Sequence, residues 1–155
     1  MNRLKRYITL LSILCVPGGD KRARFLKKMG YFKNQGVHCS FTPFNFGTEP
    51  HLISFGNNVR VATGVTFVNH DTTCMVFKYL DKQHMYKIRQ GEINIGNNVF
   101  IGANSTILYD VKIGNNVIVG AGSLVNKDIP DGVIVAGVPC KIIGSFDEYM
   151  KRLRD

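Results

Sequence analysis

An aliphatic side chain recurs every six residues through the second half of the chain. The period runs without a break from Ile95 to Val125, and the fifth place of each hexad is small or β-branched. The aliphatic residues of the six hexads are Ile95, Ile101, Ile107, Ile113, Val119 and Val125. Glycine follows four of them, and the sequence GNNV recurs at 56–59, 96–99 and 114–117. Apolar residues and turn residues therefore keep a fixed phase over six hexads.

A weaker copy of the pattern lies upstream, where Phe55, Val61 and Phe67 hold the first place. Continued upstream at the same spacing, the next first place holds Glu49, and the aliphatic pattern is lost toward the N-terminus. No α-helix has a six-residue period, and simple strand alternation would not hold Gly and Asn in phase. We therefore predict short strands joined by tight turns and stacked as an all-β, parallel β-solenoid, with three hexads in each triangular coil. The aliphatic residues would point inward, and Asn and Gly would take corners where φ is positive.

The two frames do not join, because the 28 residues from Phe67 to Ile95 are not a multiple of six. An insertion of irregular length must separate them, and residues 73–92 fit that description. A loop of this length in a compact domain is usually functional or disordered. This one carries several Met, Phe, Tyr and Leu residues, so we expect an ordered, packed excursion that protrudes from the coils.

The two ends of the chain depart from the repeat, which is expected to span residues 36–144. Residues 1–35 are basic and hold apolar residues at helical spacing, which predicts a short amphipathic helical arm. Those apolar residues are Leu4, Ile8, Leu11 and Cys15. Residues 145–155 predict a short helix that caps the open end of the solenoid. Its apolar face would consist of Phe146, Tyr149, Met150 and Leu153.

Charge is concentrated in the N-terminal arm. The chain has a formal net charge of +9, and residues 1–33 hold nine Lys or Arg against one acidic residue. No segment resembles a nucleic-acid-binding module, so no nucleic-acid partner is expected. A basic arm could face anionic lipid, an acidic glycan or solvent, which leaves peripheral contact with the inner membrane open.

The cysteines and the first residues bear on the compartment. The four cysteines have neither paired nor metal-finger spacing, which indicates reduced thiols in a cytoplasmic protein. The apolar run at 7–16 resembles part of a signal peptide. However, no small-residue cleavage site follows it, and it is too short to span a bilayer. We therefore expect a cytoplasmic protein.

The repeat segment resembles the hexapeptide-repeat acetyltransferases, and the resemblance covers about residues 36–144. The stretch INIGNNVFIGANSTILYDVKIGNNVIVGAGSLVNKDIPDGVIVAGVPCKIIG at 93–144 is similar to their C-terminal half. The stretch EPHLISFGNNVRVATGVTFVNHD at 49–71 resembles the branch that modifies capsule and O-antigen polysaccharides. The family includes galactoside, maltose, serine and streptogramin acetyltransferases.

The resemblance implies a left-handed parallel β-helix, a homotrimer with active sites between subunits, and acetyl-CoA as donor. The family's catalytic base is a His beside the loop that interrupts the coils, which by motif is His70. The positions that match its cofactor-binding residues are Phe100, Gly102, Ala103, Ala121, Gly122, Lys127 and Lys141. Small residues there would let the main chain meet the pantetheine arm, and the lysines could reach its phosphates. Tight coil packing and solvated lysines are the structural alternatives.

Two departures limit the resemblance. Phe100 stands where several members carry Trp, and the loop is longer than in the galactoside branch. The identity of the acceptor is therefore not carried over.

Acetyl transfer from a thioester needs a base for the acceptor proton and a donor for the developing oxyanion. His70 follows a predicted strand and precedes the loop, which would expose a neutral imidazole at a cleft wall. Asp71 could orient this imidazole, but neighbours on an extended strand point to opposite faces. Asp71 could equally contact acceptor hydroxyls or cap a turn, and Asn69 is a similar candidate for acceptor binding.

The sequence thus predicts an acetyl-CoA-dependent O-acetyltransferase that modifies a hydroxyl of a sugar or surface-glycan precursor by direct transfer. An N-acetyltransferase of an amino sugar or antibiotic would need the same base, and a non-catalytic trimeric β-helix scaffold is an alternative of another class. Cys74 as a nucleophile is disfavoured because no helix is expected to bring it to His70. A zinc site built from the four histidines is disfavoured because they do not hold set places on the coils, so no metal is expected.

Overall fold

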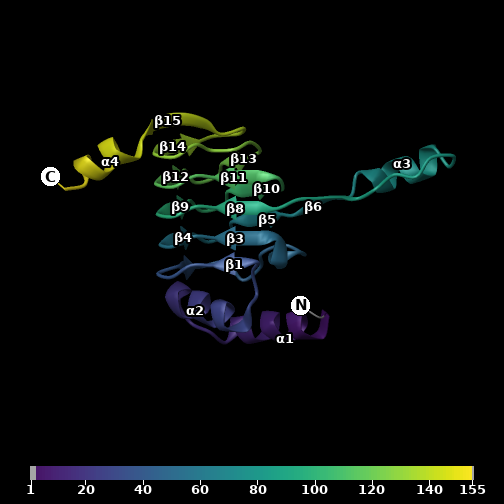
Figure 1. Ribbon diagram of the computed structural model, residues 1–155, viewed down its shortest axis with the longest axis horizontal. Helices are drawn as coiled ribbons and strands as arrows, with labels where there is room; N and C mark the ends of the chain where they lie inside the picture. The colour runs from purple at the N-terminus through teal and green to yellow at the C-terminus, as the bar shows by residue number, and fades with distance from the viewer. Residues whose placement is uncertain (1–2, 155) are drawn as a thin grey trace.

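The computed structural model describes residues 3–154 and contains three sheets of parallel strands, which form the sides of a prism (Figure 1). The first sheet contains β1 (Asn34–Gln35), β3 (Ile53–Phe55), β8 (Ile93–Ile95) and β11 (Val111–Ile113). The second contains β2 (Ser40–Phe41), β4 (Val59–Val61), β9 (Val99–Ile101), β12 (Val117–Val119) and β14 (Val133–Ala136). The third contains β5 (Thr66–Val68), β10 (Thr106–Leu108) and β13 (Leu124–Val125). The chain visits the sheets in rotation, and each round is one coil.

The register of the strands confirms the six-residue frame. Ile95 pairs with Phe55 below and Ile113 above, and all three side chains are buried. The same stacking holds in the second sheet, where Ile101 lies between Val61 and Val119, and in the third, where Ile107 lies between Phe67 and Val125. The first place of each hexad therefore forms the core, which explains why it is aliphatic.

The GNNV corners also have the expected backbone. Asn58, Asn98 and Asn116 have φ of 54°, 55° and 54° in three successive coils. The asparagine before each donates its main-chain N–H to a corner side chain of the next coil, from Asn57 to Asn97 Oδ1 at 2.8 Å and from Asn97 to Asn115 Oδ1 at 2.9 Å. In the last coil the acceptor is the carboxylate of Asp131. Asparagine suits the second place of the pair because it tolerates a left-handed backbone, and it suits the first because its side chain accepts from a main-chain donor of the neighbouring coil.

Aromatic rings fill the N-terminal end of the prism in place of the aliphatic repeat. Phe32, Phe41, Phe46 and Phe55 pack edge to face or tilted, with centroids 4.7–6.4 Å apart. Phe46 also stacks on Phe67 with ring centroids 5.6 Å apart and an interplanar angle of 22°. The third side of the first coil has no strand, so Phe46 fills the interior there without the help of a hexad.

Two helices close this end. α1 (Arg3–Leu14) and α2 (Gly19–Met29) lie beneath the first coil in Figure 1. α2 buries Ala23 and Leu26 against the aromatic cluster, and α1 contributes the buried Ile13. The helical arm is confirmed, but its buried face differs from the expected one. Ile8, Leu11 and Cys15 are exposed, while the side chain of Leu4 lies outside the described residues.

The C-terminal end is closed by a hairpin, which corrects the expectation of a helical cap. β15 (Lys141–Ser145) runs antiparallel to β14 and covers the last coil. α4 (Phe146–Arg152) exists as predicted but buries none of its residues and projects sideways from the prism (Figure 1). The hairpin covers the end because the main chain of β15 pairs with the backbone N–H and C=O groups at the free edge of β14. A helix could not form these backbone hydrogen bonds.

The insertion forms a long projecting ribbon between the second and third coils. β6 (His70–Asp71) and β7 (Arg89–Gln90) pair antiparallel at its base, and α3 (Cys74–Leu80) lies near its tip. Phe77 and Tyr86 meet at 5.5 Å between centroids, so the ribbon has contacts of its own. The expectation of a packed excursion is wrong for the single chain. Its large apolar side chains from Met75 to Ile88 are 41–96% exposed.

Candidate functional site

His70 lies at the corner where the third sheet ends and the projecting ribbon begins. It is the residue next but one after β5, and it pairs with Gln90 as the first residue of the ribbon. Its side chain is 30% exposed. The rigid coil therefore fixes the backbone of His70 on one side, while the imidazole stays accessible from outside.

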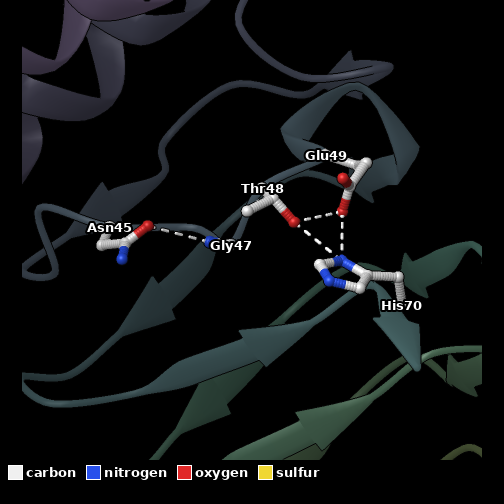
Figure 2. Close-up of polar contacts among 5 residues, drawn as sticks. All are labelled: Asn45, Gly47, Thr48, Glu49 and His70. Carbon is white, nitrogen blue, oxygen red and sulfur yellow. Dashed lines mark hydrogen bonds and ion pairs between the residues drawn. The ribbon is translucent and has the colours of Figure 1, made fainter. Parts of the chain in front are cut away.

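The ring of His70 is held by two side chains from the preceding coil, as Figure 2 shows. Its Nδ1 lies 2.8 Å from Glu49 Oε2 and 2.8 Å from Thr48 Oγ1. The Thr48 hydroxyl also donates to the same carboxylate oxygen of Glu49. The Glu49 side chain is 19% exposed, so this carboxylate is partly removed from water.

This arrangement selects one tautomer of the imidazole. A carboxylate can only accept, so the proton belongs on Nδ1, and Nε2 carries the lone pair. Among residues 3–154, no hydrogen bond to Nε2 of His70 is found. The His70–Glu49 pair therefore presents an unprotonated ring nitrogen outward and places a negative charge behind it, which is the arrangement of a general base.

Glu49 reaches His70 because the first coil departs from the repeat. The hexad frame would place Glu49 inside the prism beneath Phe67, yet Phe46 occupies that place three residues earlier. Gly47 follows with φ of 78°, and its N–H donates to Asn45 Oδ1 at 3.0 Å in a tight turn (Figure 2). The chain then turns outward, which carries Thr48 and Glu49 to the corner.

Sequence reasoning missed Glu49 as a site residue. The signal was an acidic residue at a place where the repeat requires an aliphatic one.

Asp71 does not occupy the place that a dyad would require. Its Oδ1 accepts from the Thr73 N–H at 2.7 Å, and the Tyr109 hydroxyl donates to Oδ2 at 3.4 Å. The hydrogen bonds from Thr73, with smaller help from Tyr109 and the charge of Arg89, lower the pKa of Asp71 below its usual value. The carboxylate that contacts His70 is Glu49, so the suggestion that Asp71 orients the imidazole is corrected.

Asn69 points into the interior, which corrects its suggested contact with an acceptor. Its side chain is 1% exposed, and neither of its polar side-chain atoms has a hydrogen-bond partner among the described residues. It lies directly above Gly47, where an added Cβ would come within 2.4 Å of Asn69 Oδ1. Its main-chain oxygen accepts from the Gly91 N–H at 3.0 Å. Asn69 thus supports both the turn that carries Glu49 and the base of the ribbon.

The residues expected to bind a cofactor gather mainly at a different corner. Gly102 and Ala103 precede β10, and Ala121 and Gly122 precede β13, so all four lie where the second sheet meets the third. Gly102 is buried, and a Cβ there would come within 2.5 Å of the Ala121 nitrogen, so this glycine is required by coil packing. Gly122 is exposed, has φ of 68° and has open space beside it.

The remaining three cofactor candidates divide between two corners. Phe100 points outward from β9 and is 44% exposed, and Lys141 is exposed at the start of β15 beside Ala136. Both belong to the second sheet and flank the corner of small residues. Lys127 is exposed after β13, on the corner that carries His70. In one chain, therefore, His70 and most of the cofactor candidates lie on separate corners.

Two further properties concern the part of the chain that the structure describes. Within residues 3–154, no three His, Cys, Asp or Glu side chains form a group that could hold a metal ion. Over the same residues, no helix is long and apolar enough to cross a bilayer.

Comparison with known proteins places this geometry in a family. Residues 92–127 match the model of the bacterial transferase hexapeptide (six repeats). Protein CapG of Staphylococcus aureus is 45% identical over 133 residues, which span 83% of this chain and 73% of that protein. Galactoside O-acetyltransferase of Escherichia coli (strain K12) is 34% identical over 153 residues, spanning 85% of this chain and 72% of that protein.

A solved structure agrees with these relatives. The structure of a galactoside acetyltransferase in complex with coenzyme A superimposes with a TM-score of 0.67 and 26% identity, covering 96% of this chain and 82% of that one. The shared repeat, the stacked coils and the matches over most of both lengths show that this chain belongs to the hexapeptide-repeat acetyltransferase family.

Proposed function

We propose that this protein is an acetyl-CoA-dependent O-acetyltransferase that acts on a hydroxyl of a sugar or surface-glycan precursor. The observation that carries the proposal is the His70–Glu49 pair, which leaves Nε2 unprotonated and accessible at a corner of the prism. The names of the relatives support the reaction class, since one of them acetylates the oxygen of a galactoside.

The residues of the chain account for the proton movements of such a reaction. Acetyl-CoA, when bound, supplies an acetyl group already activated as a thioester. His70 Nε2 takes the proton of the acceptor hydroxyl as that oxygen attacks the thioester carbon. The imidazolium then gives this proton to the departing thiolate, which restores the neutral base. Glu49 stabilises the imidazolium while it exists and keeps the ring in one orientation.

The corner of small residues fits the donor. Ala121 and Gly122 leave its main chain open to an extended ligand, and Phe100 offers an apolar surface beside it. Lys141 adds a positive charge at the C-terminal end of the same face, where it could reach a phosphate. We propose these residues, with Gly102, Ala103 and Lys127, as the donor-binding surface.

We propose left-handed coils and a homotrimer, as in the family, and the separation of base and donor surface supports the homotrimer. From Ala103 to the far end of β10, about six extended residues span about 20 Å across the third sheet. One chain cannot therefore bring its own small-residue corner to His70, whereas a neighbouring copy can. The apolar side chains of the projecting ribbon support the same assembly, because a neighbouring subunit would cover them. The ribbon would then border the acceptor pocket.

Calorimetric titration with acetyl-CoA is the first test, because it needs no knowledge of the acceptor. Saturable binding with one site per chain supports the proposal, and no binding at millimolar acetyl-CoA favours a non-catalytic scaffold. A screen of sugars and amino sugars, in which acetyl transfer is measured by the release of free coenzyme A thiol, then separates hydroxyl from amine acceptors. His70→Ala should abolish turnover and leave acetyl-CoA binding intact, while His51→Ala, an exposed histidine, serves as the matched control.

We further propose that the N-terminal arm contacts the inner face of an anionic membrane. The observation that favours this is the exposed face of α1, where Ile8, Leu11 and Leu14 are 52%, 68% and 64% exposed in a strongly basic segment. Replacing all three with Ser should abolish sedimentation with vesicles that contain phosphatidylglycerol. Equal sedimentation of variant and parent would contradict the proposal.

A further inference from the structure

A hollow of about 460 Å³ lies between α2 and the corner that joins β1 to β2. α2 contributes Asp20, Arg24 and Lys27 to its wall, and the first coil contributes His38. Arg60 reaches it from the outer face of β4, one coil above. The hollow opens at the corner between the first and second sheets, whereas His70 lies at the corner between the third and the first. Within one chain, the hollow is thus separate from the proposed base.

The charges around this hollow do not cancel. Three permanently cationic side chains line it against the single carboxylate of Asp20, and no ion pair joins any of them among residues 3–154. The side chains of Arg24 and Arg60 make no hydrogen bond to any described residue, so both guanidinium groups keep all their donors available. A neutral ligand would leave these donors unmatched, whereas an anion with several oxygens would satisfy them.

The wall of the hollow is held in place by contacts of its own. Lys27 Nζ donates to the Gly36 carbonyl at 3.1 Å, and Gln35 Nε2 donates to the Ala23 carbonyl at 2.9 Å. Leu26, one residue before Lys27, is fully buried in the core. These contacts fix α2 against the first coil, so the two arginines approach the hollow from separately anchored elements. The backbone that carries the two arginines is thus already ordered before a ligand binds.

We propose that this hollow binds a phosphate or diphosphate group. Guanidinium groups match phosphate oxygens in pairs, and two of them from different elements would grip a diphosphate from two sides. The site goes beyond the proposed acetyl transfer, because it assigns a second ligand-binding place that the donor surface and His70 do not use. The group could be carried by a soluble phosphorylated compound or by a lipid, and both present the same chemistry to the arginines.

Calorimetric titration of the full chain with sodium pyrophosphate at constant ionic strength tests the proposal. We expect one saturable site per chain, weakened at least about tenfold by Arg24→Gln or by Arg60→Gln, because each removes charge-assisted hydrogen bonds. Lys28→Gln is the matched control, since it removes one exposed charge from α2 outside the hollow. Its affinity should stay within about twofold of the parent.

Three outcomes would overturn the site. They are the absence of saturable binding at millimolar pyrophosphate, an equal loss of affinity in Lys28→Gln, and stoichiometric displacement of pyrophosphate by acetyl-CoA. The last outcome would mean that the hollow belongs to the donor surface. Titration of Arg24→Gln with acetyl-CoA distinguishes the two proposals, because unchanged acetyl-CoA affinity in this variant separates the hollow from the donor surface. Repeating the titration with uridine diphosphate and with farnesyl diphosphate identifies the source, since the tighter ligand shows whether the carrier is soluble or lipid, and either supports the site.

Discussion

Replacing Glu49 with Gln tests the dyad with the smallest possible change in shape. The substitution removes the negative charge that lies 2.8 Å from His70 Nδ1, while the side chain keeps its length and its place behind the ring. A hydrogen bond to a charged group contributes about 1.5–3 kcal/mol, and the side chains of His70 and Glu49 are 30% and 19% exposed. A loss of about 2–3 kcal/mol in transition-state stabilisation corresponds to a fall of about 30- to 150-fold in kcat/KM.

Glu49→Gln should lower kcat/KM through a second effect as well. The Gln amide can rotate and donate to Nδ1, which would move the proton to Nε2 and remove the base. The nitrogen-15 chemical shifts of the imidazole report this tautomer directly and need no acceptor. We therefore expect Glu49→Gln to lower kcat/KM by at least the stated factor and to shift the tautomer of His70, with little change in acetyl-CoA binding.

Two comparisons make the test sharp. Glu148→Gln, an exposed change on α4, should leave kcat/KM unaltered. Asp71→Asn should cost less than Glu49→Gln, because Asp71 is bonded to Thr73 and Tyr109 rather than to the imidazole. If Glu49→Gln retains activity within about threefold of the parent, or Asp71→Asn costs more, the assignment of Glu49 as the orienting carboxylate is refuted.

Three further predictions concern stability. Gly47→Ala should destabilise the fold by about 1–3 kcal/mol, because φ is 78° and the new Cβ would press on Asn69; an unchanged melting temperature would contradict this. Phe46→Ala should cost about 3–5 kcal/mol in denaturant unfolding because the ring is fully buried, and a loss below about 1 kcal/mol would show that its stacking is not required. Hydrogen bonds from the main chain of Asn115, and then from its side chain, lower the pKa of Asp131 in the folded protein. The Asp131 carboxylate therefore contributes to the free energy of unfolding above its unfolded pKa of about 3.9, and this contribution is lost as the pH falls through the folded pKa. Asp131→Asn should therefore lose less stability than the parent on acidification, and parallel stability curves would count against this reasoning.

The repeat could be predicted from sequence because one physical requirement recurs at one spacing. Each first-place residue from Ile95 to Val125 fills the same kind of interior place, so the aliphatic pattern and the register carry the same information. The corner asparagines were predictable for a similar reason, since few residues tolerate their positive φ. The first coil was harder, because aromatic rings such as Phe46 fill a wider space without keeping the period.

His70 and Glu49 show the limit for the site. His70 could be found because it stands at the end of a strand and at the start of an insertion. Glu49 could be noticed as an acidic residue in an aliphatic place, but its position beside His70 could not be inferred, because that position depends on Phe46 taking the interior place three residues early. No spacing rule in the sequence records that shift.

The predictions of packing for the ribbon and for α4 were wrong for another reason. Hydrophobic residues on the ribbon and on α4 show that a face is apolar, but they do not say what covers it. Leu80 on the ribbon and Leu153 on α4 are 79% and 71% exposed in the single chain. Periodicity therefore predicted α4 but not what covers it, and it missed α3, which begins at Cys74 where no helix was expected.

The way the ribbon leaves the prism bears on how such proteins diverge. Phe55 and Ile95 pair in register across the insertion, and so do Val61 and Ile101, so the coils close as though the intervening residues were absent. Residues can thus be added to or removed from the ribbon beyond Asp71 and Arg89 without disturbing any strand of the core. The length of the ribbon is therefore uncoupled from the geometry of the coils, which fix the backbone that leads into His70 and the backbone of Glu49.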